Sequence, residues 1–277
     1  MFPSRILSLL LILPSLVILL GLFVYPLGFS IVSAFTDPEG ALTLEYFRIS
    51  FTTYRTDLLF TPAIVGLSTV LIALLSIAIG GYITLGASPV AVRILSAIYR
   101  WPLFIPFIVA AQCMRTFLGR NGMMNNTLMA LGVLDPAQAQ SFLDWRGIVI
   151  TFVWKQTPFV ALMVAGAMAS LDRSTIDAAR NLGASRLRTL VEIVVPQVRD
   201  TILVGLILSF VVMMSVLSVP AMLSADSPTM ITRDMAWRIE QLGDYRTANA
   251  LGFISYLMTG IVAWFYLRAT MREKAAS

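Results

Sequence analysis

Few side chains in this 277-residue chain are equipped for catalysis or metal binding. The chain has no histidine, a single cysteine at Cys113, and two lysines, Lys155 and Lys274. Histidine-based catalysis, haem ligation and thiolate metal sites are therefore disfavoured, and no disulfide can form within the chain. Neither lysine lies in a Gly-x-x-x-x-Gly-Lys-Ser/Thr pattern, which excludes ATP hydrolysis by that phosphate-binding loop. We expect a protein that is not an enzyme and binds no cofactor itself.

Charged residues concentrate instead in one segment between two long apolar runs. Ser174, with Asp177 three residues later, predicts the start of a short helix, because the hydroxyl can accept a backbone N–H and a carboxylate suits the positive first turn. Gly183 predicts the end of this helix. Ser185 can cap a second short helix, which Pro196 is expected to end. The segment thus predicts two short helices at an angle.

The composition indicates a membrane protein. Hydrophobic residues make up 58% and charged residues 13%, with a mean hydropathy of +0.83, whereas about a quarter of a soluble domain is charged. Six apolar runs are each about long enough to cross a hydrocarbon core of roughly 30 Å, so we expect an all-α, single-domain protein with six transmembrane helices. The first run is too long for a cleaved signal and is expected to be retained. The runs cover about residues 6–35, 61–85, 102–118, 147–171, 202–223 and 248–267.

The distribution of charge predicts the orientation of these spans. With the N-terminus in the cytoplasm, the cytoplasmic loops hold 11 basic and 5 acidic residues, a net charge of +6. The external loops hold 7 basic and 10 acidic residues, a net charge of −3. By the positive-inside rule, both termini and the loop 172–200 are expected in the cytoplasm. This asymmetry also explains the formal charge of +5 without a nucleic-acid partner.

The fourth run contains the polar residues Lys155, Gln156 and Thr157 beside Pro158. A charge inside a span is costly unless it faces a water-filled cavity or a partner, or snorkels to the interface. Pro158 frees a backbone carbonyl that could join a polar lining. We therefore take these three polar residues as candidates for a translocation pathway. Arg115, near the end of the third run, is expected to snorkel, and Cys113 to be a buried thiol.

The charged segment resembles the cytoplasmic "EAA" loop in permease subunits of binding-protein-dependent ABC importers. That pattern is an acidic residue, two alanines, three residues, a glycine, and later an apolar residue and a proline. In this chain the acidic residue is aspartate where the family usually has glutamate. The resemblance implies that the loop is a coupling helix, docking in a groove of a cytoplasmic ATPase. The implied coupling residues are Asp177, Ala178, Ala179, Gly183, Leu187, Ile193 and Pro196.

Other segments show weaker resemblances. Residues 42–47 resemble the short element after the first span, and residues 119–132 resemble the external loop between the third and fourth spans. In that loop, Asn125 is predicted to cap a helix that ends at Gly132. The segment 224–252 resembles the polyamine, opine and phosphonate branch of the family, and Asn181–Gly183 points the same way, because sugar-branch permeases typically carry an aspartate before that glycine.

The resemblance implies the type I ABC importer permease fold in a bacterial inner membrane. The implied partners are a second permease subunit, identical or different, two ATPase subunits that handle ATP and Mg²⁺, an external solute-binding protein and the lipid bilayer. The apolar runs contain no acidic residue, which favours an anionic or zwitterionic solute, such as an opine, a phosphonate or another carboxylate, over a polyamine. A sugar-type permease is the alternative. A secondary transporter is less favoured, because the sequence shows neither an internal repeat nor a transmembrane carboxylate.

Overall fold

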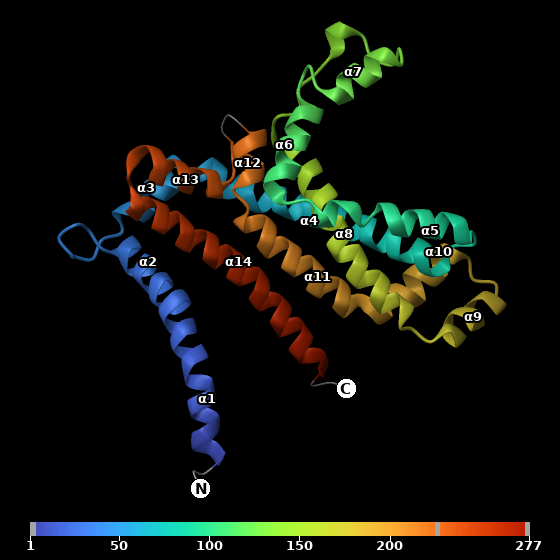
Figure 1. Ribbon diagram of the computed structural model, residues 1–277, viewed down its shortest axis with the longest axis horizontal. Coiled ribbons are helices and arrows are strands. Elements are labelled where there is room, and N and C mark those ends of the chain that lie inside the picture. Colours follow the sequence, from blue (N-terminus) through green and yellow to red (C-terminus); the bar gives the residue numbers. More distant parts are fainter. Residues whose placement is uncertain (1–3, 225–227, 275–277) are drawn as a thin grey trace. The chain divides into compact units, whose positions relative to one another are not determined.

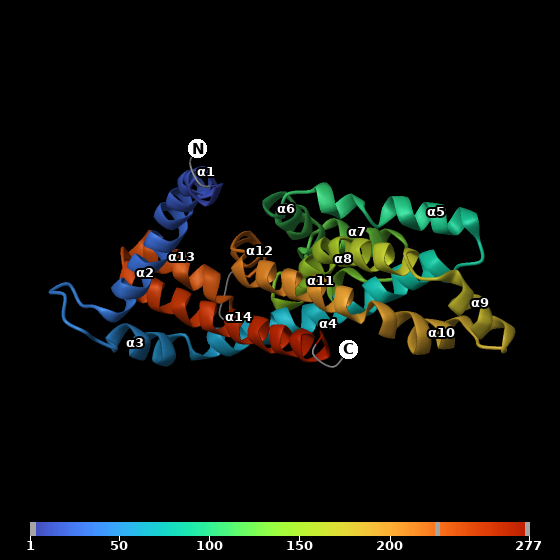
Figure 2. The same cartoon turned by 90° about the horizontal axis from the view of Figure 1, so that it is seen from below.

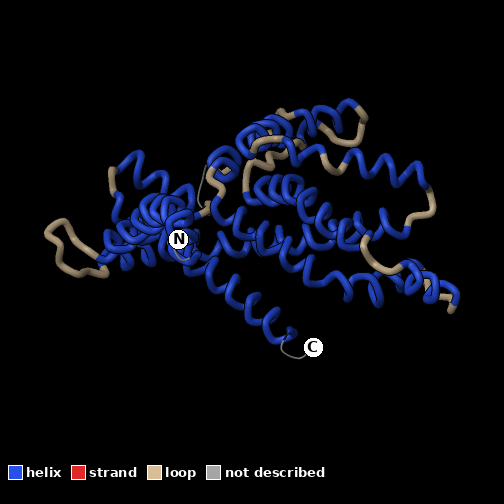
Figure 3. The backbone as a smooth tube through the Cα atoms, turned by 60° about the horizontal axis from the view of Figure 1, so that its bottom comes forward, coloured by secondary structure: helices blue, strands red, loops and turns tan. Residues whose placement is uncertain are grey.

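The computed structural model describes residues 4–224 and 228–274, and over these residues its regular structure is helical. One isolated β-bridge joins Thr36 and Leu42 in the described part of the chain. Figure 3 shows helices joined by short loops. The predicted all-α class is therefore confirmed. The chain forms two compact units, Met1–Arg55 with Asp234–Tyr256, and Thr56–Arg233 with Leu257–Ser277.

The first unit is held together by aromatic rings and a few polar contacts. The ring of Phe35 lies 4.6 Å from that of Phe47 and 5.3 Å from that of Phe253, centroid to centroid. Ser30 donates from its hydroxyl to the side-chain oxygen of Asn249 at 2.9 Å. The helices of this unit are α1 (Ser4–Leu19), the π-turn η1 (Leu20–Val24), α2 (Tyr25–Phe35), α3 (Glu45–Thr53), most of α13 (Ile231–Leu242) and the start of α14 (Tyr245–Lys274).

The second unit is built around α8, Trp145–Ala169, which packs against α6, α11, α12 and η2. Its side chains Phe152, Val160 and Val164 are fully buried. Figures 1 and 2 both place α9 and α10 at one end of this unit and α12 toward the other. The remaining elements are α4 (Arg55–Leu85), α5 (Pro89–Ile98), η2 (Trp101–Phe104), α6 (Phe107–Leu118), α7 (Met123–Ala130), η3 (Pro136–Gln138), α9 (Arg173–Asn181), α10 (Arg186–Thr189), the π-turn η4 (Leu190–Val194), α11 (Val195–Ser215) and α12 (Ser218–Leu223).

Among the described residues, five helical stretches are long and apolar enough to cross a membrane, and a bent pair gives a possible sixth. The predicted third span, 102–118, is not one helix. It is interrupted before Pro106, and the helical pair on either side meets at 107°. Proline lacks an N–H and disfavours helical geometry at the residue before it, so Ile105 is extended. The five continuous stretches are Leu11–Phe35, Arg55–Leu85, Trp145–Ala169, Arg186–Ser215 and Tyr245–Phe265.

Two prolines are accommodated by π-turns instead of ending their helices. The π-turn η4 directly precedes Val195–Pro196, and η1 directly precedes Tyr25–Pro26. A proline ring clashes with the carbonyl four residues earlier, and a π-turn displaces that carbonyl by one extra residue. The N–H of Val195 accordingly donates to the carbonyl of Leu190. The prediction that Pro196 ends a short second helix is therefore wrong.

The start of this continuous helix packs closely on α4. A side-chain carbon at Gly81 would lie 2.6 Å from a methyl group of Leu190, closer than such atoms approach. At Gly80 it would lie 3.1 Å from Val164. The two glycines therefore let η4 and α8 approach the backbone of α4. Gly66, on the same helix, has open space at the corresponding point.

Gly81→Ala should destabilise the protein by roughly 1–3 kcal/mol, because the new methyl group overpacks the contact with Leu190. Gly66→Ala should be neutral or slightly stabilising, since alanine favours helix. Thermal unfolding of the purified protein would measure both, and Leu190→Ala should recover part of the loss in the Gly81→Ala background. Equal melting temperatures for the two glycine variants would contradict the contact.

Candidate functional site

The loop that resembles a coupling helix begins with a carboxylate cap. Asp172 precedes α9, accepting from the Ser174 backbone N–H at 2.9 Å and from its hydroxyl at 2.7 Å. These two hydrogen bonds, led by the one from the hydroxyl, lower the pKa of Asp172. The prediction of Ser174 as the cap is thus two residues off. An ionised carboxylate is the stronger acceptor, so the Ser174 hydroxyl becomes a donor.

The turn between α9 and α10 follows the sequence-based prediction. Gly183 has φ of +84°, a conformation that favours glycine. Its N–H donates to the carbonyl of Arg180 at 2.9 Å, and the N–H of Ala184 donates to that of Ala179 at 3.0 Å. This pair of bonds is the Schellman helix end. Ser185 then caps α10 by accepting from the N–H of Arg188 at 3.3 Å. The predictions of Gly183 as a helix end and Ser185 as a helix cap are therefore confirmed.

The implied coupling residues divide between an exposed and a buried set. Ala179 is 8% exposed, and Ile193 is half-buried. Leu187 is 70% exposed although it is apolar, and so is Leu182, which the sequence reasoning missed, at 89%. An exposed apolar pair on an otherwise charged loop suits contact with a partner. The remaining residues of the set, Asp177, Ala178, Gly183 and Pro196, are exposed.

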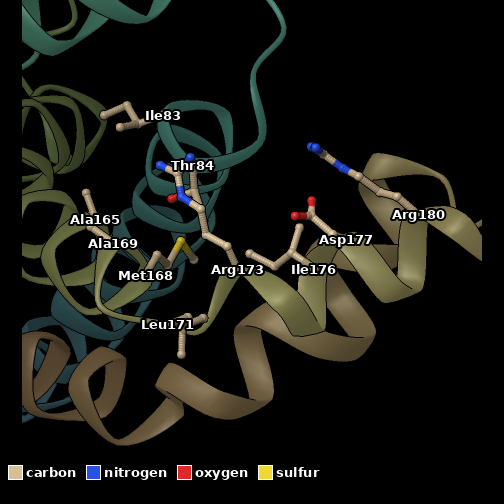
Figure 4. Close-up of a pocket in the computed structure, with 10 residues that line it drawn as sticks. All are labelled: Ile83, Thr84, Ala165, Met168, Ala169, Leu171, Arg173, Ile176, Asp177 and Arg180. Atoms are coloured by element: carbon tan, nitrogen blue, oxygen red, sulfur yellow. The ribbon is translucent and has the colours of Figure 1, made fainter.

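A pocket of about 290 Å³ is lined by residues of α9 and of the ends of α4 and α8. Figure 4 shows Arg173, Asp177 and Arg180 rising from one side of α9 toward it. Arg180 donates to the carbonyl of Leu85, the last residue of α4, at 3.3 Å. Sequence reasoning did not single out either arginine, although their spacing from Asp177, four and three residues, puts all three on one helical face.

The three candidate pathway residues on α8 are buried in this chain, with Lys155 7%, Gln156 6% and Thr157 7% exposed. The Lys155 ammonium donates to the carbonyls of Pro102 at 2.8 Å and Leu103 at 3.1 Å. It also lies 5.2 Å from the centroid of the Phe107 ring. Lys155 is therefore tied to the broken helix η2–α6. A role of these three residues in a translocation pathway stays a prediction.

Two further expectations for α6 and α7 are corrected. Cys113 is exposed, because it lies on an outward face of α6 that lines an apolar pocket of about 510 Å³ with Phe117 and Trp154. Asn125 does not cap α7, which follows Gly122. Its buried amide instead donates to three loop carbonyls. These belong to Gly119 at 3.2 Å, Arg120 at 2.9 Å and Gln140 at 2.8 Å.

The other expectations for external segments are met in part. Gly132 has φ of +69° just after α7, as predicted for a helix end. Residues 42–47 lead into the short helix α3. Of the segment 224–252, residues 225–227 lie outside the described residues, and the rest includes α13.

Comparison with known families and proteins agrees with this architecture. Residues 58–270 match the family model of the binding-protein-dependent transport system inner membrane component. The chain is 25% identical to the sulfoquinovosyl glycerol permease SmoG of Agrobacterium fabrum, over 96% of this chain and 90% of SmoG. It is 24% identical to the spermidine/putrescine permease PotB of Escherichia coli, over 61% of this chain and 62% of PotB.

The fold is also similar to that of a crystallised bacterial ABC transporter that imports the acidic polysaccharide alginate. The TM-score is 0.81 at 21% identity, covering 97% of this chain and 96% of that one. A chain of the MetNI methionine ABC transporter gives a TM-score of 0.59 at 16% identity, covering 79% and 95%. The chain belongs to the family of binding-protein-dependent inner membrane transport components, and is a multi-pass permease subunit of an ABC importer, not itself an enzyme.

Proposed function

We propose that this permease imports a carbohydrate-type solute. The observation that carries the proposal is coverage: the similarity to SmoG extends over 96% of the chain, whereas the similarity to the polyamine permease PotB extends over 61%. The trehalose/maltose permease MalF of Thermococcus litoralis is a further sugar-type relative, at 26% identity over 63% of the chain. These relatives support the sugar-type alternative better than an opine, a phosphonate or a polyamine.

The contacts of Lys155 change the argument about solute charge. Its ammonium already has two carbonyl partners in the broken helix, so it is a weaker reason to expect an anionic solute. The absence of acidic residues from the six predicted runs remains, and it still disfavours a polycation. An acidic sugar is compatible both with the sugar-type relatives and with spans that lack acidic residues.

We further propose that the loop 172–200 docks on a cytoplasmic ATPase. The exposed Leu182 and Leu187 would fill apolar space in that partner, and Gly183 fixes the angle between α9 and α10. The stretch Arg186–Ser215 is continuous, so a force on α10 would move the fifth span as one body. Rocking of the spans would then alternate access to a pathway shared with a second permease subunit.

The exposed first span supports that second subunit. None of the most apolar window of Leu11–Phe35 is buried within this chain, so the span is free to face lipid or another permease. ATP and Mg²⁺ would bind to the ATPase subunits. An external binding protein would deliver the solute, and both termini would lie in the cytoplasm.

Gly183→Pro should abolish coupling while leaving membrane insertion intact, because proline cannot adopt the positive φ of this turn. We expect at least about tenfold less co-purified ATPase and transport, which corresponds to about 1.4 kcal/mol of lost docking energy. Gly132→Pro is the matched control, since Gly132 also follows a helix with positive φ but lies in a predicted external loop. Normal ATPase recovery with Gly183→Pro would exclude this turn from docking.

The orientation can be tested with single cysteines at Ser185 and Asn126, both exposed. Cys113 must first be replaced by alanine, because its thiol is also exposed. An impermeant thiol reagent should label Asn126→Cys from outside intact cells and Ser185→Cys from the cytoplasmic side of inverted vesicles. Labelling of Ser185→Cys from outside would reverse the proposed topology.

The solute can be tested with proteoliposomes that contain the complete transporter and its binding protein. Labelled acidic sugars, neutral disaccharides and putrescine are compared at equal concentration. We expect ATP-dependent uptake of a sugar and no uptake of putrescine. Uptake of putrescine alone would overturn the carbohydrate assignment, and uptake that persists without ATP under a held ion gradient would indicate a secondary transporter.

A further inference from the structure

The pocket between α9 and the span ends combines charges of both signs with an apolar wall. Arg173, Asp177 and Arg180 lie on the α9 side. Ile83 and Met168 come from the last turns of α4 and α8. Its volume of about 290 Å³ is far above the roughly 10–15 Å³ that one water molecule needs on the same measure, so it has room for a small polar group.

The charged groups of this pocket have unused hydrogen-bonding capacity. Arg180 makes one bond, to the carbonyl of Leu85. Among the described residues, the exposed side chains of Arg173 and Asp177 form no hydrogen bond or ion pair with another residue. A guanidinium offers five donors, and an ionised carboxylate accepts several bonds. Ile176, between them on the same helix, is 7% exposed, so α9 is seated against the spans at this level.

These groups match a ligand that carries a phosphate and an ammonium. A planar guanidinium binds phosphate oxygens through two parallel bonds, and two arginines can hold one phosphate diester between them. Asp177 lies four residues after Arg173 and three before Arg180, and its carboxylate would accept from an ammonium beside that phosphate. An anion without an ammonium would instead be repelled by Asp177.

The apolar wall favours a lipid as the source of this ligand. Ile83, Ala165 and Met168 belong to helices long and apolar enough to cross the membrane, at the ends nearest to α9. A headgroup in the pocket could therefore keep its acyl chains along the spans. This step rests on the proposed cytoplasmic position of the loop, because basic pockets between spans on that side bind the phosphates of anionic lipid headgroups. The carboxylate of Asp177 adds a partner for an ammonium.

We propose that this pocket binds the headgroup of a zwitterionic phospholipid of the phosphatidylethanolamine type, with Arg173 and Arg180 on the phosphate and Asp177 on the ammonium. The lipid ties α9 to the ends of α4 and α8. It thereby sets the resting position of the loop through residues other than the exposed Leu182 and Leu187, which do not line the pocket.

The test measures lipid retention by the purified, complete transporter with native mass spectrometry. Phosphatidylethanolamine and phosphatidylglycerol with the same acyl chains are titrated separately. Arg173→Gln combined with Arg180→Gln should lower phosphatidylethanolamine retention about tenfold, since two charged donors are lost. The matched control is Arg186→Gln combined with Arg188→Gln, which removes the same charge from exposed positions on α10. Equal retention by both double variants would overturn the proposal.

Asp177→Asn tests the ammonium contact without depending on how well the other variants fold. It should weaken phosphatidylethanolamine binding and strengthen phosphatidylglycerol binding, reversing the preference of the parent. An unchanged ratio of the two lipids would overturn this assignment. This readout needs no ATPase, so it is independent of whether the loop docks on one.

Glycerophosphoethanolamine, which has the same charged groups without acyl chains, distinguishes the two sources of this chemistry. Lipid retained in its presence at tenfold excess supports the phospholipid. Displacement at equal concentration would assign the pocket to a soluble phosphate diester instead. Loss of ATPase binding in the Arg173→Gln, Arg180→Gln variant with unchanged lipid retention would assign the pocket to the ATPase and overturn the lipid proposal.

Discussion

The second unit depends on how one buried charge is satisfied. Hydrocarbon offers no hydrogen bonds, so a break in a spanning helix and an ammonium inside a span are each costly on their own. In this chain the helix break and the Lys155 ammonium satisfy each other by hydrogen bonding. Pro106 has no N–H to donate to the carbonyl of Pro102, which accepts from the N–H of Ile105 at 3.3 Å. The Lys155 ammonium donates to this carbonyl at 2.8 Å and to that of Leu103 at 3.1 Å. This contact connects the bent pair to α8, the helix against which α6, α11 and α12 also pack.

The prolines have opposite consequences in different places. Before Pro106 the chain breaks and turns by 107°, whereas before Pro196 a π-turn absorbs the ring and the helix continues to Ser215. The difference matters mechanically. A break would separate α10 from the fifth span, but the π-turn makes α10 and that span one continuous helical stretch. Gly81 then lets Leu190 of that stretch lie against α4, so the start of the stretch packs on a second spanning helix.

Sequence patterns predicted the parts of this structure that depend on local chemistry. Apolar runs located five continuous spans, but the fifth, predicted at 202–223, is a stretch over Arg186–Ser215 that ends before the separate helix α12. Gly183 and Ser185 marked the turn in the loop, because glycine tolerates positive φ and serine caps helices. The predictions failed where two neighbouring residues could both cap one helix, or where tertiary contacts determine the position of a side chain. Asp172 and Ser174 could both cap α9, and the stronger acceptor prevailed. Asn125 was free to cap α7 but is recruited by three loop carbonyls, and burial of Cys113 could not be read from an apolar run alone.

The docking role proposed for the loop would use two of its surfaces. On one side, the buried Ile176 and Ala179 hold α9 against its own spans, with the bond from Arg180 to Leu85 at the end of α4. Elsewhere on the loop, Leu182 and Leu187 are exposed, and covering such apolar side chains with a partner is favourable. If the turn between α9 and α10 were flexible, a partner could bind the exposed leucines without moving the spans. The Schellman turn at Gly183 and the capped start of α10 reduce that flexibility, so in the proposed docking the motion of a bound partner would be passed on to α4 and α11.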